Sequence, residues 1–289
     1  MTVVTIVAPA SPAPSTQKKI IEKFFKDEGF EVQFAPHVFD NERYLAGSDM
    51  DRAQDLNWAL TDEKTDIVIA LRGGYGSPRL LDKLDYEKIK KANKPFFGFS
   101  DNTALQLALY KKCKMVTFTG FNADCAVKGV GDMLLSTFRG AIQKKRMKIE
   151  NLTTLVSGQS SGVVLGGTLT MLVGLMGTPY MPKLDNVLLV VEEVHESPYR
   201  IDRMLNQLRL GGYLDNLAGV ILSSCADCTP KDVADGDVLT VFKDYFAHLG
   251  VPVVTNFPYG HIPDRIVFPM GQKAVLDADN GRLIFDKYK

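Results

Sequence analysis

Three residues of this sequence could together hydrolyse an acyl bond: Ser100, Glu192 and His261. A serine hydroxyl is a weak nucleophile until a base removes its proton, and histidine is the usual base because it titrates near neutral pH. The histidine in turn needs a carboxylate, which fixes its tautomer and stabilises the imidazolium that forms. Together the three residue types indicate a serine hydrolase.

Ser100 lies between the apolar run Phe96–Phe99 and the helical pattern Thr103–Tyr110. This order predicts a strand, a sharp turn and a helix, with the serine at the turn and backbone N–H groups close to it. A structural role stays open, because Ser-Asp-Asn-Thr before a helix is also a good N-cap. The segment also lacks the second glycine of the esterase motif G-x-S-x-G.

The carboxylate and the histidine also have second interpretations. Glu192 ends the apolar run Leu188–Val191, where an acid is often a helix cap or an ion-pair partner. His261 lies in a loop marked by proline and glycine, and it could be a catalytic base or a structural histidine. His195, close to Glu192 and Glu193, is another possible partner, although a surface ion cluster explains it equally well.

A glycine-rich segment, Arg72–Ser77, follows the apolar run Asp66–Leu71. It matches neither the dinucleotide fingerprint nor the lysine-bearing phosphate loop, so we do not expect it to bind a nucleotide. It fits better a turn whose N–H groups can approach a ligand, because few side chains cover them. One N–H from Gly73 or Gly74 and one from Asp101 could then hold the oxyanion of a tetrahedral intermediate.

Cys225 and Cys228 form a C-x-x-C motif. A zinc site would need two further ligands nearby, and the sequence has no second C-x-x-C or H-x-x-x-H pair. A thioredoxin-like motif would precede a helix early in a βαβ unit, whereas this one follows the late strand Gly219–Leu222. We therefore expect loop cysteines without chemistry, and neither a metal nor a cofactor.

The overall composition is that of an ordinary soluble globular protein. The 289 residues are 45% hydrophobic and 24% charged, with a formal net charge of zero, which suggests neither a nucleic acid nor a membrane as partner. No apolar run approaches the roughly 18–20 residues that cross a bilayer. The first residues read as a buried strand rather than a signal peptide, and four cysteines fit a reducing compartment. We expect a cytoplasmic protein.

Apolar runs alternate with helical stretches in the first half of the chain, which predicts an α/β domain with a parallel sheet covered by helices. Functional residues gather at the carboxyl ends of such strands, and both the glycine-rich segment and Ser100 fall there. Small polar residues between 144 and 162 predict a linker. The second half is mixed α and β, so we expect one domain at 1–150 with the nucleophile and another at 160–289 with Glu192 and His261.

With these residues assembled, the sequence resembles the LD-carboxypeptidases, a serine peptidase family that includes muramoyl-tetrapeptide carboxypeptidases and microcin-C self-immunity proteins. The resemblance runs nearly end to end. It rests on seven blocks: Ala8–Pro12, Arg52–Leu56, Arg72–Ser77, Gly98–Thr103, Gly166–Leu169, Glu192–Arg203 and Gly260–His261. One departure is Thr168, because family members commonly carry asparagine after the paired glycines.

The resemblance implies that Ser100 is the nucleophile, His261 the base and Glu192, the first acid of its pair, the orienting carboxylate. It implies oxyanion donors at the N–H groups of Gly74 and Asp101. Candidate substrate contacts are Arg72, Gly73, Tyr75 and Arg200. The fold it implies is an N-terminal domain like that of class I glutamine amidotransferases, followed by a mixed α/β domain with a small barrel-like sheet.

The reaction that the resemblance implies is hydrolysis of the L,D-amide bond to a C-terminal D-alanine, through an acyl-enzyme. The substrate would be a small peptide or muropeptide, a cytoplasmic peptidoglycan tetrapeptide in cell-wall recycling, and the protein would be a homodimer. Two alternatives stay open. One is a microcin-C-type immunity hydrolase of peptidyl or aminoacyl nucleotides, and the other is an α/β protein that binds a ligand without catalysis.

Overall fold

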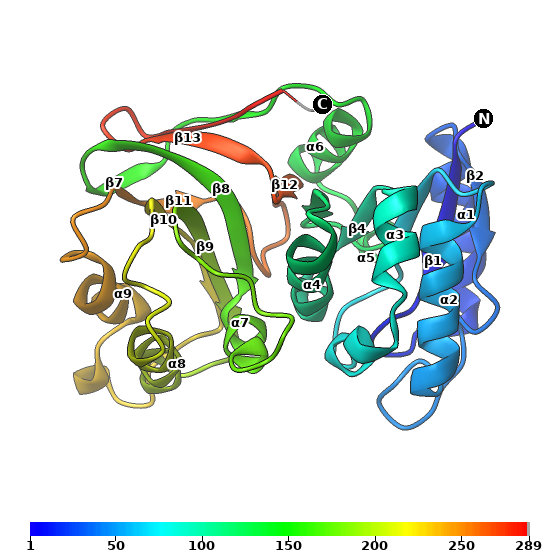
Figure 1. Cartoon of the computed structure of the whole chain (residues 1–289), viewed down its shortest axis with the longest axis horizontal. Helices are drawn as coiled ribbons and strands as arrows, with labels where there is room; N and C mark the ends of the chain where they lie inside the picture. The colour runs from blue at the N-terminus through cyan, green and yellow to red at the C-terminus, as the bar shows by residue number, and fades with distance from the viewer. Residues whose placement is uncertain (288–289) are drawn as a thin grey trace.

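The computed structural model describes residues 1–287, which form two β-sheets lying side by side with helices around them (Figure 1). The first sheet has the order β12-β5-β4-β3-β1-β2. Its strands are β1 (Val3–Val7), β2 (Glu31–Phe34), β3 (Ile67–Ala70), β4 (Phe96–Gly98), β5 (Thr117–Thr119) and β12 (Phe268–Met270). All neighbouring pairs are parallel except β12 with β5, which confirms the predicted parallel sheet of the first half.

Helices separate the strands of the first half, as the alternating pattern predicts. They are η1 (Ser15–Gln17), α1 (Lys18–Asp27), α2 (Asp49–Thr61), η2 (Ser77–Lys83), α3 (Tyr86–Ala92), η3 (Ser100–Asn102), α4 (Thr103–Cys113), α5 (Cys125–Lys128) and α6 (Asp132–Ile142). β3 is buried at every residue, because helices cover both faces of the sheet. Most helices bury one face, as α1 does with Ile21 and Phe25.

The second sheet has the order β6-β14-β13-β8-β9-β10-β11-β7. Its strands are β6 (Lys148–Ile149), β7 (Thr153–Val156), β8 (Gln159–Thr168), β9 (Val187–Val194), β10 (Gly219–Ala226), β11 (Val253–Phe257), β13 (Lys273–Asp277) and β14 (Arg282–Phe285). The helices of this half are α7 (Leu169–Leu175), α8 (Pro198–Leu210), η4 (Val233–Asp235) and α9 (Val238–Phe246). β8 to β11 are parallel, and β13 and β14 form an antiparallel hairpin.

The second sheet is strongly curled. Its two edge strands, β6 and β7, are joined only by residues 150–152, although they stand at opposite ends of the strand order. Three residues span at most about 11 Å, so the two edges must approach each other. The Thr154 hydroxyl of β7 donates to the Ala278 carbonyl beyond β13, which joins the two sides of the curl. This curvature agrees with the barrel-like sheet expected for the second half.

The segment 144–162 is not the linker that its small polar residues predict. It forms β6, β7 and the start of β8, all within the second sheet. The side chains of β7 are exposed or half-buried, so this edge strand shows no apolar run in the sequence. β6 precedes residue 150 yet joins the second sheet, and β12 joins the first sheet from the second half, so neither sheet keeps to one side of the predicted boundary.

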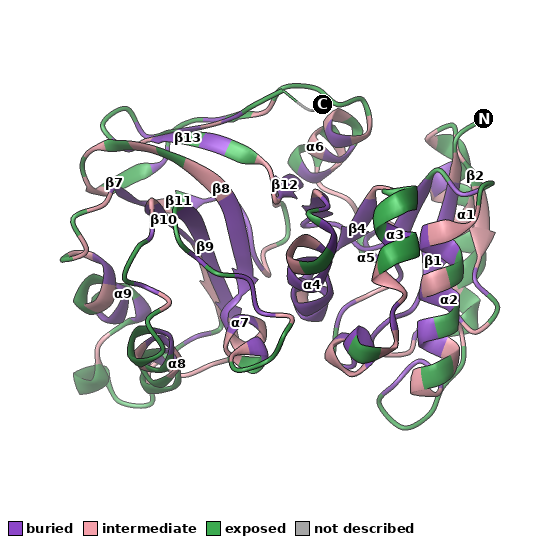
Figure 2. Ribbon diagram, viewed as in Figure 1, coloured by how far each residue is buried: buried purple, intermediate pink, exposed green. Residues whose placement is uncertain are grey.

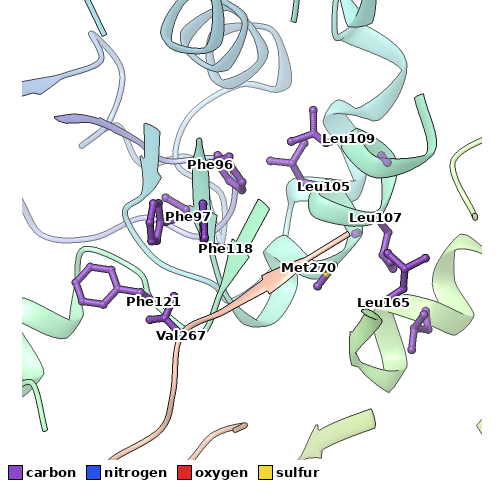
Figure 3. Close-up of a cluster of buried hydrophobic side chains, with 14 of the residues drawn as sticks. Phe96, Phe97, Leu105, Leu107, Leu109, Phe118, Phe121, Leu165, Val267 and Met270 are labelled. Atoms are coloured by element: carbon purple, nitrogen blue, oxygen red, sulfur yellow. The ribbon is translucent and has the colours of Figure 1, made fainter. Parts of the chain in front are cut away.

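α4 lies between the two sheets and is buried around most of its circumference (Figures 1 and 2). A helix with apolar residues on all sides needs such an interior position. One core cluster continues from the first sheet across α4 to the second, and Figure 3 shows Leu107 of α4 close to Leu165 of β8 and Met270 of β12. The two halves therefore share this core cluster.

We expect Phe268→Ala to lower the free energy of unfolding by about 3–5 kcal/mol, because truncating a buried aromatic residue leaves a cavity. Phe268 is 1% exposed, and its ring centroid lies 4.9 Å from that of Tyr259 and 5.3 Å from that of Phe257. Urea denaturation of the variant measures the change. Leu210→Ala, at a residue that is 71% exposed, is the control and should change stability by less than about 0.5 kcal/mol. Equal effects of the two substitutions would contradict the role of β12 in joining the sheets.

Candidate active site

Ser100 occupies the turn between β4 and α4, where the sequence predicts a strand, a turn and a helix. Its backbone is left-handed, with φ of 66°. A non-glycine residue in this region is strained, and such turns project a nucleophile away from the sheet. Gly73 approaches it closely, because a Cβ at this glycine would lie 2.8 Å from the Cβ of Ser100. Ser100 is half-buried.

The three residues singled out in the sequence lie in hydrogen-bonding contact. The Nε2 atom of His261 is 3.0 Å from Ser100 Oγ, and its Nδ1 atom is 2.9 Å from Glu192 Oε2. If Nδ1 carries the proton and donates to the carboxylate, Nε2 is free to accept the serine proton. Glu192 is fully buried, whereas His261 keeps 24% of its side chain exposed. The arrangement can therefore activate the serine hydroxyl.

Thr168 holds the other oxygen of Glu192. Its hydroxyl donates to Glu192 Oε1, so each carboxylate oxygen has one donor. Thr168 directly precedes α7 and is itself buried. The sequence marked this residue as a departure but gave no sign that it would contact Glu192.

The neighbouring acid, Glu193, points elsewhere. Successive residues of a strand face opposite sides, so Glu192 and Glu193 have different partners. Glu193 Oε2 accepts from the N–H of Thr170 at 2.8 Å and from its hydroxyl at 2.6 Å, at the start of α7. Burial raises the pKa of Glu193. Of the two acids, only Glu192 contacts the histidine.

The loop that carries His261 is anchored to the first sheet. The hydroxyls of Tyr259 and Thr119 lie 2.7 Å apart, and Tyr259 is fully buried. The N–H of Ser224 on β10 donates to the Tyr259 carbonyl at 3.1 Å. The Phe99 ring packs against His261 with centroids 4.6 Å apart. These contacts fix the imidazole relative to the nucleophile, and the sequence gave no signal for Tyr259 or Thr119.

The glycine-rich turn after β3 is held by two polar residues from other segments. Ser11 accepts the Tyr75 N–H at 3.0 Å. Gly74 has φ of 109°, and a Cβ there would come within 2.3 Å of Ser11 Oγ, so only glycine fits. Arg52 is buried in α2 and donates to the carbonyls of Pro9 and Gly76. Three of the sequence blocks that carry the resemblance therefore meet at this turn.

Asp101, the second predicted oxyanion donor, is fixed by Ser77. The Ser77 hydroxyl donates to the Asp101 carbonyl at 2.7 Å, and the Ser77 N–H donates to its carboxylate at 2.8 Å. The N–H of Asp101 lies in the first turn of η3, where a helix supplies no acceptor. Burial raises the pKa of the Asp101 carboxyl.

A cavity of about 760 Å³ opens over these groups. Gly73, Gly74 and Ser100 lie on one part of its wall. Other residues that line it include Arg72, Phe99, Asp124, Cys125, Lys128, His261, Asp264 and Arg265. The cavity joins the turn of the first sheet to the histidine loop of the second half, and it is large enough for a short peptide.

Two family models match the chain in succession. The model described as the LD-carboxypeptidase N-terminal domain covers residues 4–120, and that of the C-terminal domain covers residues 161–276. The chain belongs to the LD-carboxypeptidase family. This confirms the resemblance seen in the sequence and makes the chain a member of a peptidase family.

Named relatives and solved structures of this family cover nearly the whole chain. A Bacillus subtilis protein named "probable murein peptide carboxypeptidase" is 32% identical, over 95% of this chain and 88% of its own. The crystal structure of muramoyltetrapeptide carboxypeptidase from Oxalobacter formigenes is 31% identical with a TM-score of 0.91, covering 99% of both chains. The structure of MccF in complex with glutamyl sulfamoyl guanosine, at 22% identity, has the same fold with a TM-score of 0.89, over 99% of this chain and 96% of the other.

Two of the predicted substrate contacts of this LD-carboxypeptidase family member lie apart from the cavity wall. Tyr75 is 45% exposed, and its ring packs on Tyr44 with centroids 5.7 Å apart. Arg200 is exposed on α8, where it contacts Glu196 and Tyr199. The described residues that line the cavity include Arg72 and Gly73 but neither Tyr75 nor Arg200. A substrate contact at Tyr75 or Arg200 stays a prediction.

His195, the alternative histidine, and the pair Cys225 and Cys228 do not belong to the hydrogen-bonded set formed by Ser100, His261 and Glu192. His195 is exposed, with Nδ1 3.6 Å from an Asp227 oxygen. Cys225 ends strand β10 rather than lying in the loop that we expected, because the strand extends beyond its apolar residues. The Cys228 thiol donates to the Ala226 carbonyl at 3.4 Å, and the neighbouring Cys225 lowers the pKa of Cys228.

Within residues 1–287, no group of three or more histidine, cysteine or acidic residues is arranged to hold a metal ion. No helix in the same range combines the length and the apolarity needed to cross a bilayer.

We expect Thr168→Val to reduce kcat/KM for peptide hydrolysis about 10-fold or more. The valine keeps the volume but leaves a buried oxygen of Glu192 without its donor, which costs about 1–3 kcal/mol. Thr168→Ser, which keeps the hydroxyl, should retain most of the activity. Steady-state kinetics of the three proteins test this expectation, and a valine variant as active as wild type would refute it.

Proposed function

We propose that the protein is a serine-type LD-carboxypeptidase that removes the C-terminal D-alanine from a cytoplasmic muropeptide tetrapeptide. The observation that carries the proposal is the continuous set of contacts from Glu192 through His261 to Ser100 at the floor of the cavity. Membership of the family, and the names of relatives that act on murein peptides, support the substrate class.

The proposed reaction begins when Ser100 Oγ attacks the carbonyl carbon of the scissile amide, while His261 Nε2 takes the serine proton. The N–H groups of Gly74 and Asp101 stabilise the negative oxygen of the tetrahedral intermediate. His261 then gives its proton to the leaving nitrogen, D-alanine departs, and the shortened peptide remains as an ester on Ser100. Water, deprotonated by His261, attacks the ester, and the serine regains its proton as the peptide acid is released.

Glu192 acts in this scheme through His261. Its carboxylate keeps the proton on Nδ1 and stabilises the imidazolium that forms in each half-reaction. Because the carboxylate is completely buried, water does not screen this interaction. Thr168 holds the second oxygen and so fixes the direction of the first.

We extend the proposal to the organisation of the chain. Residues 1–150 would supply the nucleophile and the oxyanion donors, and residues 160–289 would supply Glu192 and His261. Arg72 and Gly73 would contact the substrate from the cavity wall. A cytoplasmic location, suggested by the few cysteines and the N-terminal residues, and a homodimer, suggested by the family resemblance, complete the proposal.

We expect wild type to release D-alanine from a muropeptide tetrapeptide, and Ser100→Ala to reduce the rate by at least about 10⁴-fold. His261→Ala should cost about as much, and the double variant little more, because the two residues act as a unit. Chromatographic quantification of free D-alanine is the measurement. Ser136→Ala, at an exposed serine on α6, is the matched control and should leave the rate unchanged.

The same assay separates the alternatives. Release that survives Ser100→Ala would exclude the proposed mechanism. If wild type hydrolyses an aminoacyl-nucleotide conjugate but not the tetrapeptide, the microcin-immunity type of activity is the correct one. If it binds a muropeptide without hydrolysing it or the conjugate, the protein is a ligand-binding member of the fold.

A further inference from the structure

We propose that Arg265 binds the C-terminal carboxylate of the substrate, so that the site selects a peptide with a free C-terminal residue. This inference rests on the proposed carboxypeptidase function. A carboxypeptidase must distinguish a terminal carboxylate from a continuing chain, and a guanidinium is the side chain best matched to a carboxylate in shape and charge.

Arg265 lies beside the groups proposed for catalysis. Its guanidinium carbon is 4.4 Å from the centroid of the Phe99 ring, and the same ring packs on His261 at 4.6 Å. Arg265, Phe99 and His261 all line the cavity. The guanidinium and the imidazole therefore contact the same aromatic ring, which places Arg265 close to His261.

The chemistry requires the leaving residue close to His261. The histidine that takes the serine proton must return it to the leaving nitrogen, so that nitrogen lies next to His261. In a carboxypeptidase the leaving group is one residue, and its carboxylate lies about 3.5 Å, one residue length, beyond the scissile bond. A receptor for this carboxylate must therefore belong to the surroundings of His261, as Arg265 does.

Arg265 is held in place and still has donors to offer. A guanidinium carries five N–H groups. Nε donates to the Gly120 carbonyl at 2.7 Å, Nη1 to the Ile262 carbonyl at 3.1 Å, and Nη2 to the Cys125 sulfur at 3.3 Å. One N–H on each terminal nitrogen thus has no acceptor among residues 1–287, and a sulfur is a weak acceptor that a carboxylate can outcompete. The two free N–H groups suit a carboxylate.

The acids on the cavity wall do not neutralise Arg265. Asp124 pairs with Lys128 at 2.5 Å. Asp264 accepts two backbone N–H groups at the start of α6, at 3.0 and 3.3 Å. Within residues 1–287, no carboxylate lies within 4.0 Å of a guanidinium nitrogen of Arg265. Its positive charge is therefore available to an anionic ligand in a cavity that is partly shielded from water.

The other guanidinium of the cavity, Arg72, is less suited to this task. It immediately precedes Gly73 in the turn that carries the proposed oxyanion donor Gly74, and its Nη1 donates to the Pro12 carbonyl at 3.1 Å. Oxyanion donors face the carbonyl oxygen, away from the leaving nitrogen. Arg72 therefore serves as a matched comparison, with the same charge on a different wall of the same cavity.

The test compares a tetrapeptide that ends in D-alanine with the same peptide ending in D-alaninamide. We expect wild type to prefer the acid by about 10–100-fold in kcat/KM, the effect of a hydrogen bond to a charged group. Arg265→Gln should reduce this preference to less than about 3-fold, by slowing hydrolysis of the acid and not of the amide. Arg265→Lys, which keeps the charge but not the planar fork, should give an intermediate preference, and Arg72→Gln should keep the wild-type preference.

The ratio of the two substrates separates substrate binding from a structural effect. If Arg265 only holds the loop through the Ile262 carbonyl, Arg265→Gln slows both substrates equally and the preference stays, which would overturn the inference alone. Loss of the preference in Arg72→Gln instead would assign the carboxylate to the other wall and also overturn it. Failure of wild type to release either product would overturn the proposed function and, with it, this inference.

Discussion

A buried carboxylate, that of Glu192, is the constraint on which the site depends. A carboxylate removed from water is costly unless donors surround it, and no water reaches this one. Its donors come from two different places, Thr168 at the end of β8 and His261 in the loop after β11. Both carboxylate oxygens have a hydrogen-bond donor only when these two segments pack against β9. The hydrogen bond that compensates its burial also points the imidazole at Ser100, so folding and activation of the serine depend on one contact.

The proposed nucleophile and the proposed base come from different sheets, which makes the packing between the sheets part of the site. Ser100 Oγ and His261 Nε2 meet at 3.0 Å although 161 positions separate them in the chain. α4 starts just after the serine and is buried between the sheets, so the turn cannot shift without disturbing the shared core. The pairing of β12 with β5 and the contact of Tyr259 with Thr119 hold the histidine loop to the first sheet from the other side.

The sequence predicted those parts that leave a local pattern. Long apolar runs revealed most strands, and Ser100, Glu192 and His261 stood out because each comes after an apolar run. β5, β6, β7 and β12 escaped, because β6 has only two residues, threonines make up half or more of β5 and β7, and a proline interrupts β12. The supporting residues Arg52, Ser77 and Thr168 escaped for another reason. A buried polar residue looks like any surface residue until its partners, up to 43 positions away, are known.

The cavity has two walls, which differ in the groups that they present to a substrate. The wall at the glycine turn presents the backbone of Gly73 and Gly74, in a turn fixed by Ser11 and Arg52, together with the Arg72 side chain. The opposite wall consists of side chains on the histidine loop and on α5, including Arg265 and Cys125. A substitution keeps the backbone N–H groups of a residue but replaces its side chain. Selection of the leaving group can therefore vary on this second wall while Ser100 and the proposed oxyanion donors stay where they are.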